Sequence, residues 1–481
     1  MEKEHLNVLF VQVDQWSHCF TGYGGCSEIM TPTIDQLARD GVIFSNCYST
    51  CPVCIPARRS LMTGMFPKSH GDRVYSDKMY MPDACTMAEA FSEAGYQTVA
   101  VGKLHVYPQR SRIGFNEVIL QEEGRYEFGM MDDYQTWLGE HGFVGMEFMH
   151  AMGNNTYYTR TWPLPEYTHP TAWTTKQMVQ QIIRRDPLKP LFLYLSYQFP
   201  HPPLVPVSAY MDMYKERELS LPVGDDWSDD SFIMKEMQAS AVNYTDKEID
   251  LAKRAYFAQC TYIDHQLRLV IGALRENGLL DKTLIVFTSD HGEMLFDHKM
   301  VGKRSFYENS AHIPLILSGH PIASMRGENI DKLACLEDVM PTILRFCGID
   351  VPNTVEGIDL LHENREFLYG EISEGSKATR MIRSDKYKLI YYPYGNVTQL
   401  FDLEKDPKEI HNLSRDEAYK EIKSKLEMFL IQSLYGEDKT WIRNNKLRGV
   451  EAPEYKEKPD YGFSNQRGLH WPRAIQNNLE G

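Results

Sequence analysis

Residues 6–13 read Leu6-Asn7-Val8-Leu9-Phe10-Val11-Gln12-Val13, and Asp14-Gln15 follow at once; this stretch decides the fold. Its apolar and β-branched residues make both faces of the segment apolar, as in a strand buried within a parallel sheet. The stretch Leu284-Ile285-Val286-Phe287-Thr288 has the same character and leads into Ser289-Asp290-His291-Gly292. Further strands are predicted at 98–101, 190–197 and 313–317.

Helices are predicted between these strands. The segments 33–41 and 86–94 each begin at a threonine that can cap a helix, and a long amphipathic helix runs from Phe257 to its stop at Gly278. This alternation indicates an α/β fold with a large, mostly parallel central sheet flanked by helices. Ligands of such sheets bind beyond the carboxyl ends of the strands, so Asp14 and Asp290 are expected to lie at one site.

The character of the chain changes after about residue 362. Residues 386–392 alternate like a half-exposed strand, and residues 416–435 have the pattern of a helix. We therefore predict a catalytic α/β domain over 1–362 and a smaller C-terminal α+β subdomain over 363–481. The polar, proline-punctuated tail from about residue 438 has no assignment.

Composition limits the partners of the protein. The 481 residues include 51 Lys and Arg against 66 Asp and Glu, a formal net charge of −15, which argues against binding to nucleic acid or to an anionic membrane surface. No secretory signal and no membrane-spanning segment are expected. The 9 cysteines, an odd number, are taken as reduced thiols of a cytoplasmic protein. The oligomeric state stays open, a homo-oligomer included.

A cluster of cysteines at 47–54 allows three interpretations. It could be an inert loop before a helix, or Cys47, Cys51 and Cys54 could ligate an iron–sulfur cluster in the C-x3-C-x2-C spacing that radical-SAM enzymes use. In the third, Cys54-Ile55-Pro56-Ala57-Arg58 resembles the sulfatase signature C-x-P-x-R, and Leu61-Met62-Thr63-Gly64 resembles its L-x-T-G continuation.

The rest of the chain favours the third interpretation, because further blocks in the same order resemble the sulfatase family. These blocks are Gly102-Lys103-Leu104-His105, His201-Pro202-Pro203, Ser289-Asp290-His291-Gly292, Gly302-Lys303 with Tyr307-Glu308, and the turn at 400–407. They span nearly the whole chain. The resemblance implies an alkaline-phosphatase/sulfatase-like fold and the hydrolysis of a sulfate monoester that releases inorganic sulfate.

A divalent cation fits this chemistry independently of the resemblance. Sulfate ester hydrolysis needs positive charge that is most effective in the transition state, and a hard cation held by oxygen-rich ligands supplies it. Asp14, Gln15, Asp290 and His291 are the candidate ligands, joined by the side chain at position 54. Most sulfatases have Asp where Gln15 stands and Asn where His291 stands. We expect Ca²⁺, with Mn²⁺ or Zn²⁺ as alternatives because imidazole is a softer ligand.

The resemblance also implies the nucleophile. In sulfatases the signature cysteine, here Cys54, is oxidised by a formylglycine-generating maturase to 3-oxoalanine (formylglycine), whose hydrate attacks sulfur. A covalent sulfated intermediate splits the hydrolysis into two steps. Because an unmodified thiol cannot perform the second step, Cys54 is expected to be converted.

The remaining roles carry over by position from the matching blocks. Arg58 is expected to hold the modified side chain, Lys103 and Lys303 to contact the sulfate, and His105 to act as the base of the second step. His201 is the expected acid for the leaving oxygen.

The substrate is less well defined by the sequence. Arg110 or Arg112 could bind a second anionic group such as a uronate carboxylate. The Lys-x-His block followed by Tyr107-Pro108-Gln109-Arg110 resembles the corresponding run of some glycosaminoglycan-sugar sulfatases, and this resemblance favours a small sulfated carbohydrate over choline sulfate or an aryl sulfate. The same metal-ligand pattern occurs in phosphonate monoester hydrolases, so a phosphonate monoester or phosphodiester hydrolase is the main alternative. Lys103 and His105 favour sulfate. A catalytically inactive binding module is a further alternative, although each expected site residue is present.

Overall fold

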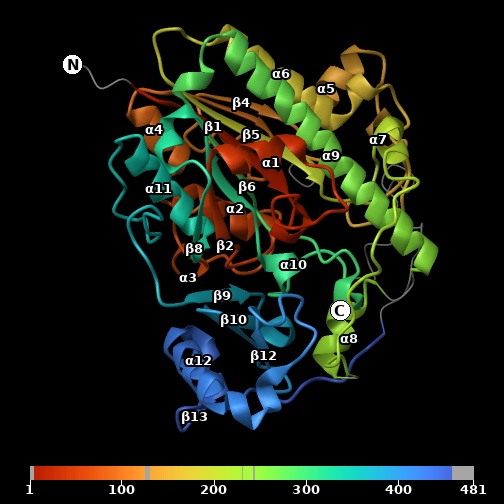
Figure 1. The fold of residues 1–481 in the computed structure, drawn as a ribbon, viewed down its shortest axis with the longest axis vertical. Coiled ribbons are helices and arrows are strands. Elements are labelled where there is room, and N and C mark those ends of the chain that lie inside the picture. Colours follow the sequence, from red (N-terminus) through yellow and green to blue (C-terminus); the bar gives the residue numbers. More distant parts are fainter. Residues whose placement is uncertain (1–4, 125–130, 230, 242–243, 458–481) are drawn as a thin grey trace.

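The structure is a computed structural model of the chain, and it describes residues 5–124, 131–229, 231–241 and 244–457. A large sheet forms its centre (Figure 1). Its 8 strands are β1 Asn7–Asp14, β2 Val42–Tyr48, β3 Gln97–Gly102, β4 Glu117–Leu120, β5 Leu191–Pro200, β6 Thr283–Ser289, β7 Leu315–Ser318 and β8 Glu328–Cys335. They lie in the order β4-β3-β5-β1-β6-β7-β2-β8, and only β7 runs antiparallel to its neighbours.

The described chain contains helices on both faces of this sheet and others elsewhere. They are α1 Pro32–Asp40, α2 Cys54–Thr63, α3 Pro67–His70, α4 Met87–Glu93, α5 Asp133–Glu140, α6 Pro170–Arg184, α7 Ser208–Asp212, α8 Phe232–Gln238, α9 Asp246–Glu276, α10 Glu308–Ala311, α11 Val339–Phe346 and α12 Lys420–Ser433. One apolar cluster joins α1, α6 and α9 to one face of the sheet, and a second joins α2, α4 and α11 to the other.

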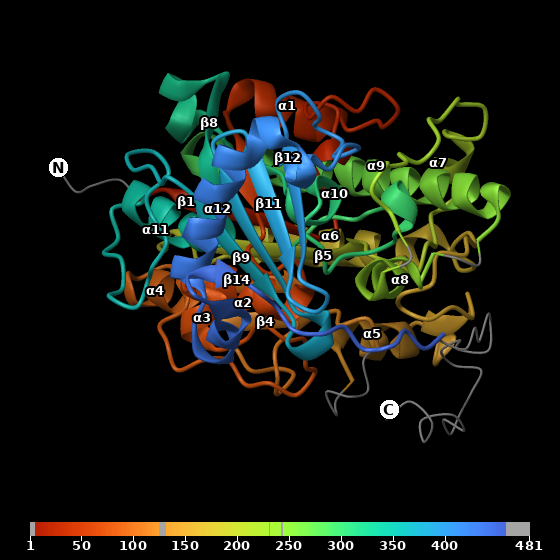
Figure 2. The ribbon, with the colours of Figure 1, turned by 90° about the horizontal axis from the view of Figure 1, so that it is seen from below.

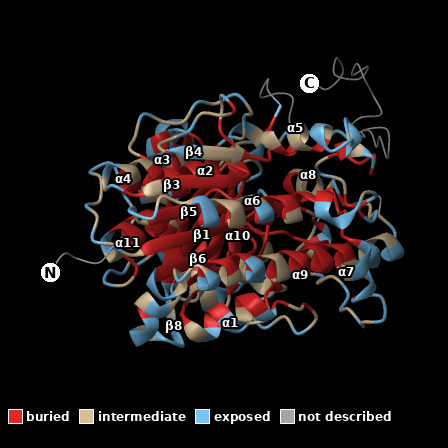
Figure 3. Cartoon of the chain, turned by 90° about the horizontal axis from the view of Figure 1, so that it is seen from above, coloured by how far each residue is buried: buried red, intermediate tan, exposed pale blue. Residues whose placement is uncertain are grey.

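Strand β1 shows why the sequence folds this way. Leu9, Val11 and Val13 belong to the first cluster, whereas Val8 and Phe10 belong to the second. Side chains of a strand alternate between its faces, so a strand that is apolar at consecutive positions fills both layers at once. Figure 3 shows the central strands buried between helices whose outer surfaces are exposed. This packing fixes the carboxyl ends of the strands along one edge.

A second, smaller sheet follows in the C-terminal part of the chain. It is antiparallel, in the order β12-β11-β10-β9, with β9 Leu368–Ile372, β10 Thr379–Ser384, β11 Tyr387–Tyr392 and β12 Val397–Asp402. Helix α12 packs against this sheet, as Figure 2 shows from below. A short hairpin of β13 Ile442–Arg443 and β14 Lys446–Leu447 comes after α12.

The predicted fold class is confirmed: a mostly parallel sheet flanked by helices and a smaller α+β part are both present. The strand predicted at 313–317 is β7 Leu315–Ser318, but it is antiparallel, and β2, β4 and β8 were not predicted. The tail left unassigned from about residue 438 contains the β13–β14 hairpin, and residues 458–481 lie outside the described chain. The division at residue 362 stays a prediction. No helix of the described segments combines the length and apolar character needed to cross a bilayer.

Candidate active site

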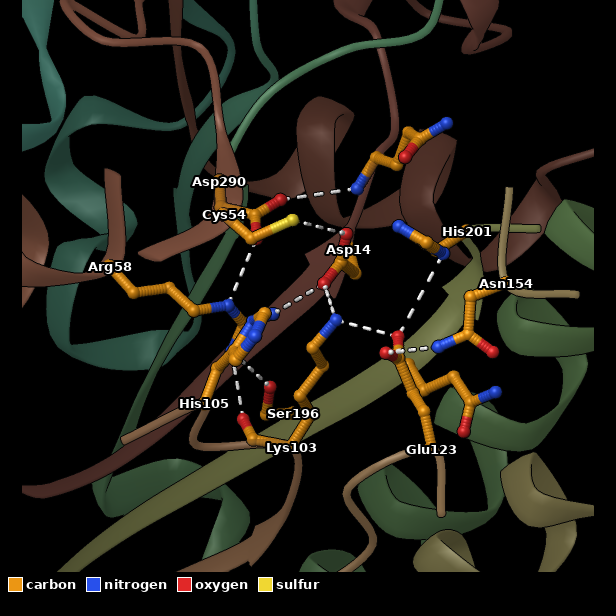
Figure 4. A network of polar contacts seen from close by, with 12 residues as sticks. Asp14, Cys54, Arg58, Lys103, His105, Glu123, Asn154, Ser196, His201 and Asp290 are labelled. Carbon is orange, nitrogen blue, oxygen red and sulfur yellow. Dashed lines mark hydrogen bonds and ion pairs between the residues drawn. The ribbon is translucent and has the colours of Figure 1, made fainter. Parts of the chain in front are cut away.

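The two acidic strand ends meet at the centre of the sheet. Strands β1 and β6 are parallel neighbours with Val13 opposite Ser289, so Asp14 and Asp290 leave the same edge side by side. The backbone N–H of Gln15 donates to Oδ1 of Asp290 over 3.1 Å. The convergence that the sequence predicts is therefore present in the structure (Figure 4).

Four buried side chains form a group that can hold a metal ion. Asp14, Cys54, Asp290 and His291 each offer a ligand atom, and these atoms lie within 4.8 Å of one another. The Nδ1 atom of His291 lies 3.1 Å from the carbonyl oxygen of Gly292, and its Nε2 atom lies 3.1 Å from Sγ of Cys54. Two carboxylates and an imidazole nitrogen that faces them are suitable donors for a divalent cation.

Gln15 lies beside this group, with its amide held from behind. Its Nε2 donates to the hydroxyl of Tyr157 over 3.0 Å and makes a short contact with the carboxylate of Glu293. Its Oε1 accepts from Nζ of Lys303 over 2.5 Å, so the amide oxygen faces the site. Gln15 has a φ of 69°, a left-handed conformation uncommon for a residue with a side chain.

Helix α2 places Cys54 and Arg58 on its first turns. Sγ of Cys54 lies 3.8 Å from Oδ1 of Asp14. The guanidinium of Arg58 donates to Asp290 over 2.9 Å and to Asp14 over 3.2 Å, and it also reaches the carbonyl of Lys103 over 2.8 Å and the hydroxyl of Ser196 over 3.1 Å. Arg58 is buried and fully engaged, so it fixes both carboxylates and the end of β3 (Figure 4).

Three further cationic or imidazole side chains surround the same space. Nζ of Lys103 lies 2.6 Å from Oδ2 of Asp14 and 2.6 Å from Oε1 of Glu123. Nζ of Lys303 lies 2.6 Å from Nε2 of His201. Nδ1 of His201 lies 2.7 Å from the carbonyl oxygen of Pro202, so Nδ1 carries a proton and Nε2 accepts from Lys303. Lys103 and His201 are buried, and Lys303 is half-buried.

His105 comes from the loop after β3. Its backbone N–H, like that of Leu104, donates to the carboxylate of Glu122, over 3.0 and 2.8 Å. These bonds hold His105 at a φ of 60°. Its side chain helps to lower the pKa of the Cys54 thiol, and its Nε2 lies 3.5 Å from the hydroxyl of Tyr75. The Gly-Lys-x-His block therefore delivers Lys103 and His105 to the same site.

The charges of the site stabilise an anion at position 54. Burial works to raise the pKa of the Cys54 thiol, but Lys303, His291 and Lys103 together hold it well below its ordinary value. Burial and Cys54 also work to raise the pKa of Asp14, whereas Lys103, His201 and Arg58 lower it to about 2. The charges around the site therefore favour a negative charge at position 54 and on Asp14.

Two sets of predicted residues make their contacts outside this centre. Arg110 binds Asp133 through both carboxylate oxygens, at 3.0 and 3.2 Å, and Arg112 donates to the carbonyl of Asn116 over 2.5 Å. The two other cysteines of the 47–54 cluster do not share the metal-ligating group of Cys54. Among the described residues, Cys47 packs in the core beside α2, and Cys51 packs in a separate cluster. The structure does not support the iron–sulfur interpretation.

Several residues of the site were not predicted from the sequence. Glu123 contacts Lys103, and Glu293 and Tyr157 hold Gln15. Glu293 directly follows Asp290-His291-Gly292, so its place in that block was an available signal. Glu122 and Glu123 follow the carboxyl end of β4, which would have marked them had that short strand been recognised.

Comparison with known proteins agrees with this fold. Residues 6–349 match the family model of the sulfatases, and residues 296–434 match the model for the C-terminal part of N-sulphoglucosamine sulphohydrolase. The chain belongs to the sulfatase family, within the alkaline phosphatase superfamily, and is a sulfuric ester hydrolase.

Two curated relatives are similar along most of their length. An arylsulfatase from Clostridium perfringens is 36% identical over 465 residues, which are 92% of this chain and 97% of the relative. A choline-sulfatase from Rhizobium meliloti is 29% identical, over 85% of this chain and 82% of the relative.

Solved structures share the fold. The phosphonate monoester hydrolase of Agrobacterium radiobacter superposes with a TM-score of 0.76 at 21% identity, covering 89% of this chain and 95% of that one. A protein solved in complex with its substrate, D-glucosamine-2-N, 6-O-disulfate, superposes with a TM-score of 0.73 at 20% identity, covering 89% of this chain and 97% of that one. At this identity the likeness concerns the fold alone.

Proposed function

We propose that the protein hydrolyses the sulfate ester of a small sulfated carbohydrate, using a divalent metal and a formylglycine made from Cys54. The observation that carries the proposal is the position of the Cys54 side chain. It lies on the first turn of α2, and its Sγ and the ligand atoms of Asp14, Asp290 and His291 lie within 4.8 Å of one another. The cations of Lys103 and Lys303 lower the pKa of its thiol. A cysteine that only packed in the core would not be expected to lie among metal-ligating and cationic side chains.

The metal is proposed to bind to Asp14, Gln15, Asp290, His291 and the modified side chain at position 54. The donor set, with two carboxylates, an amide and one imidazole, is rich in oxygen, which favours Ca²⁺ over Mn²⁺ or Zn²⁺. A bound cation would supply positive charge against the sulfate oxygens, and formylglycine would supply the oxygen nucleophile that a thiol lacks.

The residues of the chain complete this chemistry. Arg58 keeps both metal-binding carboxylates in place, and Lys103 and Lys303 bring positive charge to the sulfate. His201 presents Nε2 beside Lys303, and once Nε2 has taken up a proton it can give that proton to the leaving oxygen. His105, whose side chain helps to lower the pKa of Cys54, is proposed to accept the proton released at position 54 when sulfate is expelled.

The phosphonate monoester or phosphodiester hydrolase remains the alternative, because a phosphonate monoester hydrolase shares the fold. The arylsulfatase and choline-sulfatase relatives favour sulfate instead. The ratio of kcat/KM for an aryl sulfate to kcat/KM for an aryl phosphonate ester distinguishes the two. A ratio above one supports the proposal, and a ratio well below one overturns it.

The proposal also includes a formylglycine-generating maturase as a partner and a cytoplasmic location. All 9 cysteines are free thiols, which is compatible with a reducing compartment. Mass spectrometry of the peptide that contains position 54, after expression with and without such a maturase, tests the modification directly.

Two separate cysteine substitutions test the assignment of the nucleophile. Cys54→Ala is expected to abolish sulfate release while leaving the fold intact, because the side chain belongs to the site. Cys51→Ala is the matched control: it is equally buried, three positions earlier, and is expected to keep turnover. Both variants are compared with the wild type by sulfate release and by thermal unfolding. Retained activity in folded Cys54→Ala protein would contradict the assignment.

A further inference from the structure

Of the three cationic side chains of the site, Lys303 is the most exposed, and this edge of the site is called its opening. Arg58 and Lys103 are buried, Lys303 is half-buried, and Arg304, the next residue along the chain, is exposed. Consecutive Cα atoms are about 3.8 Å apart, so the two side chains leave the loop from neighbouring points. A substrate group bound at Lys303 therefore lies close to the segment that carries Arg304.

The chain holds Arg304 in a fixed place at this opening. Its φ is 75°, in the left-handed region, and its backbone N–H donates to the carbonyl of Pro52 over 3.0 Å. Pro52 stands two positions before Cys54, so this bond ties Arg304 to the loop that presents the nucleophile. A conformation of this kind costs free energy and is kept only where the surroundings impose it.

The side chain of Arg304 lies over an aromatic ring that also belongs to the site. Its guanidinium carbon lies 5.5 Å from the centre of the Tyr75 ring. The hydroxyl of Tyr75 donates to Asp77 over 2.6 Å and lies 3.5 Å from Nε2 of His105. Stacking on a ring fixes the plane of the guanidinium and leaves its N–H edge available for hydrogen bonds.

Arg304 differs from the other arginines around the site in its partners. Arg58 lies between two carboxylates, and Arg110 is held by both oxygens of Asp133. Within the part of the chain that the structure describes, no carboxylate lies within ion-pair distance of Arg304. A fixed, exposed guanidinium without a carboxylate beside it is suited to a planar or tetrahedral oxyanion from solution.

We propose that Arg304, stacked on Tyr75, is a subsite for a second anionic group of the substrate. The group is a carboxylate or an additional sulfate on the sugar that carries the ester, or on the sugar next to it. This inference rests on the proposed function and names its substrate class: sulfated sugars with at least two anionic groups. A quaternary ammonium group is disfavoured, since two cations flank the opening and a guanidinium covers the face of Tyr75.

Substrates with one and two anionic groups test the subsite. The matured, metal-loaded enzyme is assayed with p-nitrophenyl sulfate, a hexose monosulfate, the corresponding hexose disulfate and a sulfated uronic acid. In Arg304→Gln we expect the ratio of kcat/KM for the doubly anionic sugars to kcat/KM for the monosulfate to fall at least tenfold. Arg304→Lys keeps the charge but not the planar fork, and should recover part of the ratio. Whether the disulfate or the uronic acid loses more identifies the second group.

The control is Arg326→Gln. Arg326 is also exposed, but it pairs with Asp40 on another part of the surface, and this variant is expected to leave the ratio unchanged. An unchanged ratio in Arg304→Gln, with p-nitrophenyl sulfate still hydrolysed, overturns the subsite and leaves Arg304 a packing partner of Tyr75. If the wild-type enzyme hydrolyses none of the sulfate esters, the proposed function fails and the subsite with it.

Discussion

Gln15 and Glu293 show how a single neighbour can set the chemistry of a ligand. The carboxylate of Glu293 receives the backbone N–H groups of Leu295 and Gly302 with Oε1, each over 2.7 Å. Its Oε2 receives the hydroxyl of Tyr157 over 2.5 Å and the amide Nε2 of Gln15. Because this carboxylate can only accept, the amide must turn its Nε2 toward Glu293 and its Oε1 toward the site.

We therefore predict that Glu293→Gln weakens metal binding. The new side chain must keep its oxygen toward the two backbone N–H groups, so its NH₂ group would face the NH₂ group of Gln15. The amide of Gln15 would then turn away or lose its support, and the affinity for Ca²⁺ should fall by about 10- to 100-fold. Calorimetric titration of the metal-free protein measures this. Glu404→Gln, in an exposed ion pair with Lys386, is the control, and equal affinities in the two variants would contradict the prediction.

Glu122 makes a prediction about pH at the same scale. Burial raises its pKa from 4.5 to about 7, against the opposing effect of the N–H groups of His105 and Leu104. The folded protein therefore binds a proton at Glu122 that the unfolded chain has already released between these two pH values. Stability from this group is present below pH 4.5 and is lost as the pH rises through 7, by up to about 3 kcal/mol.

The variant Glu122→Gln removes this titration but keeps an oxygen for both backbone N–H groups. We expect its Tm, measured relative to the wild type, to increase between pH 5 and pH 8, because only the wild type must bury a charge at the higher pH. Differential scanning calorimetry over this range is the measurement. A Tm difference that stays constant or decreases with pH would show that Glu122 is ionised in the folded protein throughout.

At the scale of elements, the carboxyl end of β3 depends on the absence of a side chain. Gly102 has a φ of 104°, and a Cβ atom there would lie 1.9 Å from the carbonyl oxygen of Ser196 on β5. The next residue, Lys103, donates its N–H to that same oxygen over 3.0 Å. A methyl group would therefore separate the two strands at the point where β3 delivers Lys103.

Gly102→Ala is expected to lower the free energy of unfolding by about 3 kcal/mol or more and to reduce kcat/KM. Gly25→Ala is the matched control, because Gly25 has a similar φ of 98° but nothing within 4 Å of the added Cβ. That variant should lose only the free energy that a left-handed backbone conformation costs a residue with a side chain, about 1 kcal/mol. Chemical denaturation of both variants separates the steric effect from the conformational one. If the two variants lost equal free energy of unfolding, the separation of β3 from β5 at Gly102 would have no cost in free energy, and the prediction would be wrong.

The elements also show what the sequence could and could not predict. Strands β1 and β6 were recognised because apolar residues fill both of their faces, and the parallel order of their ends brought Asp14 and Asp290 together. Strand β2 carries Ser45 and Asn46 in its middle, and β4 has only 4 residues, so neither has a clear pattern. Glu123 lies 20 positions from its partner Lys103, and Glu293 lies 278 positions from its partner Gln15. No local periodicity of the sequence encodes contacts over such separations.

At the scale of the whole molecule, a buried charge cluster joins the second sheet to the catalytic part. Nζ of Lys388, on β11, lies 2.7 Å from Glu308 and 2.6 Å from Glu409. Glu308 begins α10, directly after the block that contains Lys303, and also accepts from the hydroxyl of Tyr48 on β2. All three charged side chains of the ion pairs are buried, so the cluster is held away from solvent and salt.

Removing the cation from this cluster should affect the molecule as a unit. Lys388→Met fills a similar volume but leaves Glu308 and Glu409 buried beside each other without the ammonium group that they share, which costs about 3 to 5 kcal/mol. Lys386→Met, two positions earlier, removes only an exposed pair with Glu404 and should have little effect on stability. Urea unfolding followed by tryptophan fluorescence and circular dichroism measures both losses. Because α10 and the Lys303 loop are continuous, we also expect Lys388→Met to lower kcat/KM before global unfolding begins. Equal stability of the two variants would mean that the second sheet is held by its apolar contacts alone.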